Sequence, residues 1–421
     1  PNYNAIPEAD KEIMETAQTM ADGNVYSLSS FQPEAWNFTP NRTFINKAWL
    51  DKLGLAVPTT TEELKDVLIA FRDNDPNGNG KMDEIGVYGY QGGWYGENVL
   101  ATLMNSFVFW NRGGQNGGLS LAEDGSTVIA PFATEGWKKG LQYMNDLYNE
   151  GLLAPGIFID DGSQFKATLN EEDNVVGFVS MGSVSNYPDA ATNANFLEME
   201  MIQPLTGPDG ICYVPYTQYS PDQNLFIFSA TKNAELAVRF ADEFYDSDTS
   251  IIVRYGEEGV DWTRDPEVLS GVTNAFVEEG LYDKVSLASI SNMWSENSTQ
   301  TWHNCNPRYT SAEVCNTVAN GMVEYNADDP TQLHGKNYAY YADKHPDKVL
   351  PLLHYTEEDS VLIQDALANI PEYVNKAMAE FITGARDIES GWDAYLDEMN
   401  SLGLEQWLTI AQKTYDESLE N

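Results

Sequence analysis

The sequence predicts an α/β protein with mixed sheets flanked by helices and a helical block at its C-terminal end. Strand and helix signals alternate through residues 85–230, as a layered α/β architecture requires. Apolar residues at helical spacing then run through residues 357–382 and 391–415, with interruptions near Gly384 and Gly403. The chain of 421 residues can bury a large core, and its length favours two or more domains.

Each predicted element has a local signal. The helix expected over residues 61–71 carries its apolar side chains on one face, and its Thr-Glu entry offers capping chemistry. Further helices are expected at 8–20, 47–53, 134–150 and 234–245, and strands at 24–29, 42–46, 87–90, 175–179 and 225–228. Four tryptophans on amphipathic helices are expected in the core: Trp49, Trp137, Trp392 and Trp407.

Composition limits the possible functions. A formal charge of −42 argues against binding DNA or RNA, which requires a basic surface, and it disfavours strongly anionic ligands. No apolar run reaches the length of about 18 residues that a membrane span needs. The sequence contains no nucleotide-binding loop, no Gly-x-Ser-x-Gly and no His-Glu-x-x-His. Of the three cysteines, Cys305 and Cys315 could form a disulfide or remain free thiols.

A stretch rich in oxygen-bearing side chains follows the predicted helix over residues 61–71. It runs DNDPNGNGKMDE over residues 73–84, with glycines that break regular structure. A hard cation such as Ca²⁺ binds about six to eight oxygen ligands, which a loop of this kind can supply. We therefore predict a calcium site, and a solvated Asn/Gly turn without metal is the alternative. A strand rather than a second helix is expected after the loop, which favours a structural staple over a calcium sensor.

Two ligand registers fit this stretch. The full EF-hand pattern begins at Asp73, with Gly78 sixth and Glu84 twelfth. A shorter register begins two residues later and places a glycine directly before the carbonyl ligand. We favour the shorter register because it uses both acids at the end of the run. Its ligands are Asp75, Asn77, Asn79, the backbone carbonyl of Lys81, Asp83 and Glu84.

Four longer stretches, together with this loop, carry a family pattern. They are TFINKAWLDKLGLAVPTTTEELKDVLIAFRDNDPNGNGKMDEIGVYGY, YNEGLLAPGIF, FSATKNAELAVRFADEFYDSDTSIIVRYGEEGVDW and AEFITGARDIESGWDAYLDEMNSLGLEQWLTIAQKTYDE. The chain resembles the extracellular solute-binding proteins of ABC importers, in particular lipoproteins related to alginate- and aldouronate-oligosaccharide binders. The resemblance covers essentially the whole chain. Its most specific parts are the Asn-Gly-Asn-Gly-Lys-x-Asp-Glu loop and the Phe-Ile-Thr-Gly…Trp-Asp-x-Tyr segment.

The resemblance implies a two-lobed fold of the periplasmic-binding-protein type (type II). The chain is then expected to cross between lobes near residues 40–44, 226–229 and 350–355. Lobe one would consist of residues 1–43 and 226–350. Lobe two would consist of residues 44–225, which include the calcium loop 73–84, and of the C-terminal helices in residues 351–421.

The resemblance also implies a function. The chain would be the substrate-binding component of an ABC importer, capturing an oligosaccharide between its lobes without chemistry. Its partners would be the membrane permease subunits. It would lie outside the cell, held by a lipid anchor that this sequence does not contain, or in the periplasm of a Gram-negative source.

Aromatic residues in predicted loops are the candidate ligand contacts, since ligand pockets combine an apolar floor with a few placed polar groups. Trp94 and Tyr95 occupy a glycine-flanked turn between a strand and a helix, and this turn lines the cleft in the resembled family. Trp36 precedes the first expected crossing, and we favour Trp36 and Trp94 as contacts. Ordinary packing is an equal alternative for the remaining candidates, which are Trp294, Trp302 and Tyr216.

Two other functions stay open at this point. A glycoside hydrolase would need two carboxylates about 5–5.5 or 6.5–9.5 Å apart, and no acid pair stands out in this acid-rich sequence. A receptor for peptides or other non-sugar ligands could use the same fold, because a fold does not fix its ligand.

The resemblance also bears on the start of the chain. Members of the resembled family carry roughly another hundred residues before the segment that matches residues 2–29, so we expect this sequence to be a mature or shortened form. Lobe one would then lack its opening strands. Unpaired strand edges and apolar surface would favour self-association or a partner segment.

Overall fold

The computed structural model describes residues 1–92, 97–111, 115–188, 190, 192–290, 304–319 and 334–419. The largest sheet in this part of the chain has four strands in the order β3-β6-β2-β7. β2 runs antiparallel to β6 and β7, whereas β3 runs parallel to β6, so the sheet is mixed. The bounds are β2 (Arg42–Asn46), β3 (Ile85–Tyr88), β6 (Val176–Met181) and β7 (Met199–Ile202).

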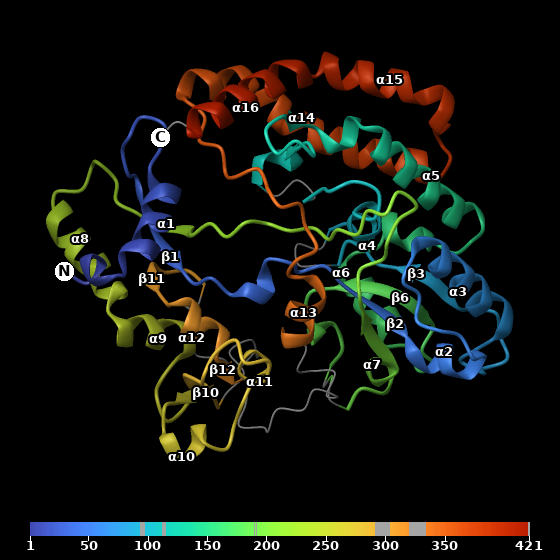
Figure 1. Cartoon of the computed structure of the whole chain (residues 1–421), viewed down its shortest axis with the longest axis horizontal. Helices are drawn as coiled ribbons and strands as arrows, with labels where there is room; N and C mark the ends of the chain where they lie inside the picture. The colour runs from blue at the N-terminus through green and yellow to red at the C-terminus, as the bar shows by residue number, and fades with distance from the viewer. Residues whose placement is uncertain are drawn as a thin grey trace.

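Two three-stranded sheets lie at the other end of the molecule (Figure 1). The first has the order β11-β1-β8, in which β1 pairs parallel with β11 and antiparallel with β8. The second has the order β12-β10-β9. Their strands are β1 (Ser27–Phe31), β8 (Asp222–Phe226), β9 (Trp262–Thr263), β10 (Leu287–Ser289), β11 (Arg308–Tyr309) and β12 (Val318–Ala319). A two-stranded sheet joins β4 (Ser120–Leu121) and β5 (Val128–Ile129).

Helices surround these sheets. In the half of the chain with the large sheet they are α2 (Lys47–Leu53), α3 (Thr61–Asn74), α4 (Val99–Met104), α5 (Glu135–Asn149), α6 (Gly162–Leu169) and α7 (Ala194–Leu197). With the smaller sheets lie α1 (Glu8–Gln18), α8 (Ala234–Asp242), α9 (Ser247–Tyr255), α10 (Pro266–Leu269), α11 (Ala275–Glu278) and α12 (Ala312–Asn316). Figure 1 shows α13 (His334–Tyr341) between the two groups.

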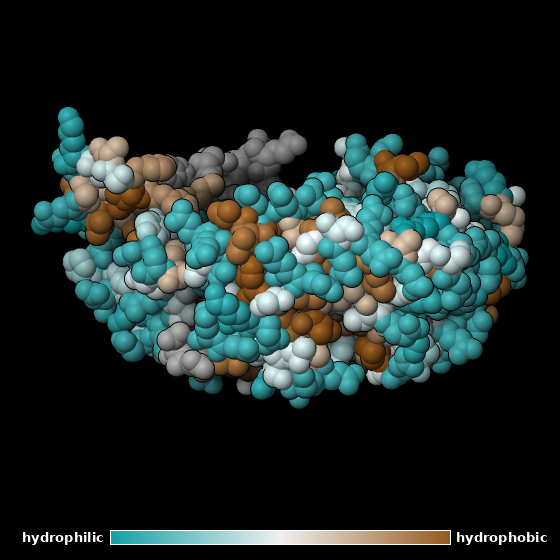
Figure 2. Space-filling model, turned by 90° about the horizontal axis from the view of Figure 1, so that it is seen from above, coloured by the Kyte–Doolittle hydropathy of each residue, from teal (hydrophilic) through white to brown (hydrophobic). Residues whose placement is uncertain are grey.

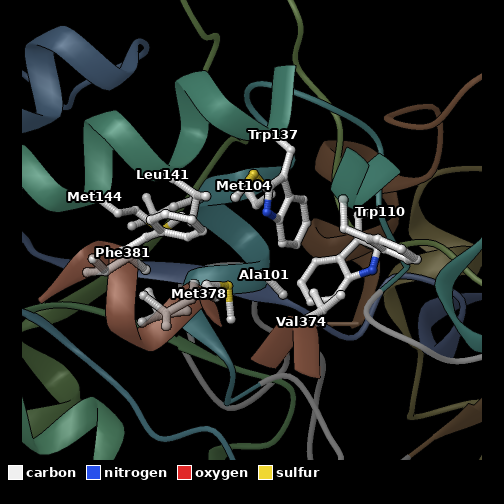
Figure 3. Close-up of a cluster of buried hydrophobic side chains, with 14 of the residues drawn as sticks. Ala101, Met104, Trp110, Trp137, Leu141, Met144, Val374, Met378 and Phe381 are labelled. Carbon is white, nitrogen blue, oxygen red and sulfur yellow. The ribbon is translucent and has the colours of Figure 1, made fainter. Parts of the chain in front are cut away.

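The C-terminal block consists of α14 (Glu357–Ile382), α15 (Ile388–Ser401) and α16 (Leu404–Ser418). These helices share one hydrophobic core with α4, α5 and the large sheet. Figure 3 shows Phe381 and Met378 of α14 packed against Leu141 and Met144 of α5. The four helix tryptophans expected in the core are at most 8% exposed, which confirms that prediction.

Most predicted elements exist, and three of them have the predicted bounds: β2, α2 and α14. The strand expected at residues 24–29 was misplaced. β1 covers Ser27–Phe31 because β11 pairs with its last two residues, Ser30 and Phe31. The strand expected at 225–228 was also misplaced, since β8 covers Asp222–Phe226 opposite β1. In both cases the pairing partner, which lies far away in the sequence, decides the bounds.

Apolar side chains are exposed where β8 forms an edge of its sheet. Phe228 just after this strand is 78% exposed, and Leu236 and Phe240 of α8 are also largely exposed. Figure 2 shows apolar residues at the end of the molecule that carries α8. Self-association through such a surface stays a prediction. Within the described ranges, no helix is both long and apolar enough to cross a membrane.

Candidate functional site

Three connecting segments run side by side where the large sheet meets the smaller sheets. Residues 32–41 link β1 to β2, residues 203–221 link β7 to β8, and residues 342–356 link α13 to α14. The Thr217 amide donates to the Phe38 carbonyl at 3.2 Å, and the Val214 amide donates to the Lys344 carbonyl at 2.8 Å. Figure 1 shows residues 203–221 running between the two groups of sheets. We call this region the junction.

Trp36 lies at the junction in the short 3-10 helix Ala35–Asn37 and is half-buried. The guanidinium carbon of Arg42 lies 5.5 Å from the centre of its ring, a cation–π contact. The Trp36 carbonyl accepts hydrogen bonds from Arg42 Nη2 at 2.9 Å and from Asn337 Nδ2 at 3.0 Å. Trp36 is therefore held in place by the first residue of β2 and by α13.

Tyr216 also lies at the junction, and its ring is engaged by neighbours. It stacks on His345 with ring centroids 3.8 Å apart and meets Phe38 edge-on at 6.5 Å. Burial raises the pKa of the Tyr216 hydroxyl. His345 and Arg42 were missed by sequence reasoning. Arg42 could have been noticed as the one basic residue of the strand predicted at residues 42–46, but no local signal marks His345.

The remaining aromatic candidates Trp94, Tyr95, Trp294 and Trp302 lie outside the described residues. Trp94 and Tyr95 follow β3 in the sequence, and the residues of this strand pair with β6 up to Tyr88 and Val179. In open α/β sheets ligands bind beyond the carboxyl ends of parallel strands. The structure thus places Trp36 and Tyr216 on neighbouring segments of the junction, and the other four stay sequence predictions.

The predicted calcium loop connects α3 to β3. Asp75 ends α3 with a left-handed backbone (φ 44°), and its two carboxylate oxygens accept the amides of Gly78 at 3.0 Å and Gly80 at 3.1 Å. Both glycines have positive φ, which a residue with a side chain rarely adopts. Asp73 lies within α3 and pairs with Arg72 at 2.7 Å. These contacts favour the register that begins at Asp75.

The side chains of this loop converge on its closing acids. The amides of Asn77 and Asn79 donate to the Asp83 carboxylate at 3.2–3.3 Å. By contrast, both carboxylate oxygens of Glu84 are buried and receive no hydrogen bond from the part of the chain that the structure describes. Burial raises the pKa of Glu84, the charges of Asp75 and Asp83 raise it further, and the nearby backbone amides of Glu84 and Asn77 offset only part of the rise. This arrangement buries a carboxylate beside two further acids.

The donor set constrains any metal here. Among the described residues no three His, Cys, Asp or Glu side chains gather closely enough to hold a metal ion by themselves. A cation in this loop would need the asparagine oxygens and the Lys81 carbonyl as well, which is an all-oxygen set suited to Ca²⁺. The structure also distinguishes the cysteine alternatives, since Cys305 is exposed, Cys315 is buried, and the two do not form a disulfide.

Comparison with known proteins identifies the family. Residues 13–249 match the family model described as bacterial extracellular solute-binding protein. The fructooligosaccharide ABC transporter substrate-binding protein FusA of Streptococcus pneumoniae is 26% identical over 436 residues, which cover 100% of this chain and 74% of FusA. This chain therefore belongs to the bacterial extracellular solute-binding proteins, as its sequence pattern indicated.

Solved structures show the same fold. FusA in complex with kestose has a TM-score of 0.71 at 24% identity, covering 100% of this chain and 82% of that one. A human-milk-oligosaccharide (HMO)-binding protein from Bifidobacterium longum infantis has a TM-score of 0.77 at 22% identity, covering 99% and 81%. The alginate-binding protein AlgQ2, solved without calcium ion, has a TM-score of 0.68 at 19% identity, covering 99% and 79%. The predicted two-lobed α/β fold is confirmed.

Proposed function

We propose that this protein captures an oligosaccharide between its two lobes, without chemistry, as the substrate-binding component of an ABC importer. The observation that carries the proposal is the junction, where three segments join the sheets and on which both Trp36 and Tyr216 lie. FusA, of which 74% matches the whole of this chain, is named as a fructooligosaccharide ABC transporter substrate-binding protein. We keep the lobe bounds predicted from the sequence, at residues 43, 225 and 350, as part of this proposal.

The sugar would contact aromatic rings at the junction. Trp36 is half-buried, and Arg42 contacts both its carbonyl and its ring, so this ring is ordered before a ligand arrives. Trp94, Tyr95, Trp294 and Trp302 are proposed as further contacts from their places in the sequence, and Tyr216 as a contact whose ring already stacks on His345. A ring ordered before binding costs less entropy when the ligand arrives.

A thermal-shift screen against neutral and acidic oligosaccharides tests the proposal. A ligand that binds only the native state raises the melting temperature, and the rise grows with the logarithm of the ligand concentration above the dissociation constant. We expect at least one glycan to raise the melting temperature and to be recovered intact. A panel without any shift would count against sugar capture. Shortened glycans would support the glycoside hydrolase, and shifts with peptides alone would support the peptide receptor.

The partners and the location belong to the same proposal. A receptor of this family would deliver its sugar to the membrane permease subunits of the importer. We propose an extracellular position, with attachment through a lipid anchor outside this sequence, or a periplasmic one in a Gram-negative source. Pull-down of the permease by the sugar-loaded protein would test the partnership.

We further propose that the loop Asp75–Glu84 binds calcium and serves as a structural staple. Its support is the Glu84 carboxylate, whose two buried oxygens have no donor in the described chain. Bound calcium would neutralise this charge and those of Asp75 and Asp83. Asn77, Asn79 and the Lys81 carbonyl would complete the oxygen set. The loop is also tied to its surroundings, since Lys52 Nζ donates to the Pro76 carbonyl at 2.7 Å.

Calcium binding can be measured directly by calorimetric titration of the chelator-treated protein. The account expects saturable binding of one ion per chain, lost in Glu84→Gln. Glu62→Gln is a matched control, because it removes an exposed acid from the start of the neighbouring helix. Equal calcium binding by both variants would exclude Glu84 as a ligand.

A further inference from the structure

The backbone carbonyl of Trp36 is held from two sides. Arg42 Nη2 donates to it at 2.9 Å from the first residue of β2, and Asn337 Nδ2 donates at 3.0 Å from α13. Asn337 lies 301 positions further along the chain than Trp36. Two elements that are remote in sequence therefore fix one peptide group in the first connecting segment.

The two donors are buried inside the junction. Arg42 is 2% exposed and Asn337 is 0% exposed. Arg42 also donates through Nη1 to the carbonyl of Gly182, directly after β6. Within the described residues no carboxylate forms an ion pair with Arg42, so its charge is compensated only by carbonyl oxygens and by the Trp36 ring. A buried cation without a counter-ion costs free energy.

Helix α13 is anchored on both of its sides. The Tyr341 hydroxyl lies 3.1 Å from the Thr43 amide and 2.9 Å from Thr43 Oγ1, so it bonds to the residue after Arg42. One turn earlier, the ring of Tyr338 lies 5.3 Å from that of Phe276 in α11. Asn337 thus projects from a helix that is fixed to the large sheet and packed on the other group of elements.

Stability alone does not explain this pair of donors. Arg42 Nε and Asn337 Oδ1 are buried and have no hydrogen-bond partner in the described chain. Each such atom costs about 1–3 kcal/mol. Native proteins keep few unsatisfied buried groups, and each one that remains calls for an explanation. Both side chains donate to the Trp36 carbonyl, which points to a role at Trp36.

We propose that Arg42 and Asn337 are positioning residues for ligand binding. Their hydrogen bonds fix the Trp36 peptide group, and the Arg42 guanidinium, 5.5 Å from the ring centre, holds the ring in one orientation at the junction for stacking on a sugar. The inference rests on the proposed function, because it takes Trp36 as a ligand contact. It adds that the orientation of this ring is set by two side chains that do not themselves touch the ligand.

The variants Arg42→Met and Asn337→Leu test this. Each replaces a polar side chain by an apolar one of similar length, and Met retains the aliphatic packing of the arginine stem. We expect about tenfold weaker binding of kestose in calorimetric titration and a somewhat lower melting temperature, because each variant leaves the buried Trp36 carbonyl with one donor fewer. Arg239→Met, which removes an exposed arginine of α8, is the control and should leave both quantities unchanged. Arg42→Lys is a milder change, so its affinity for kestose should lie between that of Arg42→Met and that of the unaltered protein.

Hydrogen exchange gives a measure that needs no sugar. The amides of Asn37 and Phe38 are bonded within the segment, to the carbonyls of Glu34 and Ala35. In both variants these amides should exchange faster, while those of the helix α5 remain protected.

A lower melting temperature with unchanged kestose affinity would overturn the proposal and leave a structural role. Unchanged exchange at Asn37 and Phe38 would also overturn it. Failure of the unaltered protein to bind kestose or any glycan of the panel would count against the proposed function instead.

Discussion

The calcium loop and the junction are built in opposite ways. All six proposed ligands of the loop lie within residues 75–84, and most of its hydrogen bonds join residues no more than six positions apart. The junction is assembled from segments near residues 36, 182, 216 and 337–345, which only the folded chain brings together. A local site can be recognised from a short sequence, whereas an assembled site cannot. The two should also respond separately to mutation.

Calcium removal should produce the largest effect, and it should act on stability. At a calcium concentration 100 times the dissociation constant, binding stabilises the native state by about 2.7 kcal/mol. Chelation should therefore lower the melting temperature by several degrees, and Glu84→Gln should abolish the difference between calcium and chelator. Sugar affinity should change little. Identical melting curves with calcium and with chelator would show that the loop is not a calcium-dependent structural staple.

Loss of the Trp36 ring should act on affinity instead. Trp36→Ala should weaken sugar binding by about 1–3 kcal/mol, the loss typical of a buried aromatic anchor. Trp94→Ala is expected to do the same. The response of the melting temperature to calcium should stay intact in both. Tyr26→Ala, which removes a largely exposed ring before β1, is the control. If Trp36→Ala and Trp94→Ala both bound sugar like the unaltered protein, the contact would have to lie elsewhere.

The pH dependence of calcium stabilisation sharpens the same comparison. The pKa of Glu84 is raised in the folded, metal-free protein, so the native state binds more protons than the unfolded state. The contribution of Glu84 to the free energy of unfolding of the metal-free protein therefore decreases with rising pH. The decrease extends from the pKa of Glu84 in the unfolded state through its higher pKa in the folded state. Calcium binds the ionised carboxylate, so the rise in melting temperature that calcium causes should become larger over that pH interval. Melting curves with calcium and with chelator, recorded from pH 4 to 7, measure it. A gain independent of pH would contradict the role of Glu84.

The smallest effect is expected from Lys52. Its ammonium donates to the Pro76 carbonyl at 2.7 Å and is close to Gly78, but it is not a proposed ligand. Lys52→Met should lower the stability of the calcium-free protein by about 1 kcal/mol or less, the typical net contribution of one hydrogen bond. Calcium affinity should hold or rise, because a nearby positive charge is removed. Weaker calcium binding in this variant would place Lys52 inside the site.

The sequence predicted those parts of the fold that depend on local pattern. β2, α2 and α14 have the expected bounds because strand propensity, a glycine stop or helical spacing marks both of their ends. β1 and β8 were shifted by about three residues, since β11 and β1 decide which residues pair. The same difference between local and long-range contacts distinguishes the calcium loop from the junction. The loop could be predicted with its ligands, whereas the clamp on Trp36 joins a side chain of α13 to a backbone carbonyl, for which sequence offers no signal.

Calorimetric titration of the unaltered protein with the glycan that gives the largest thermal shift, followed by mass analysis of the recovered sugar, tests the central claim most directly. The account predicts saturable binding of one glycan per chain, weakened in Trp36→Ala, and recovery of the sugar at its original mass. Absence of saturable heat with any glycan of the panel, or recovery of a shortened sugar, would contradict it.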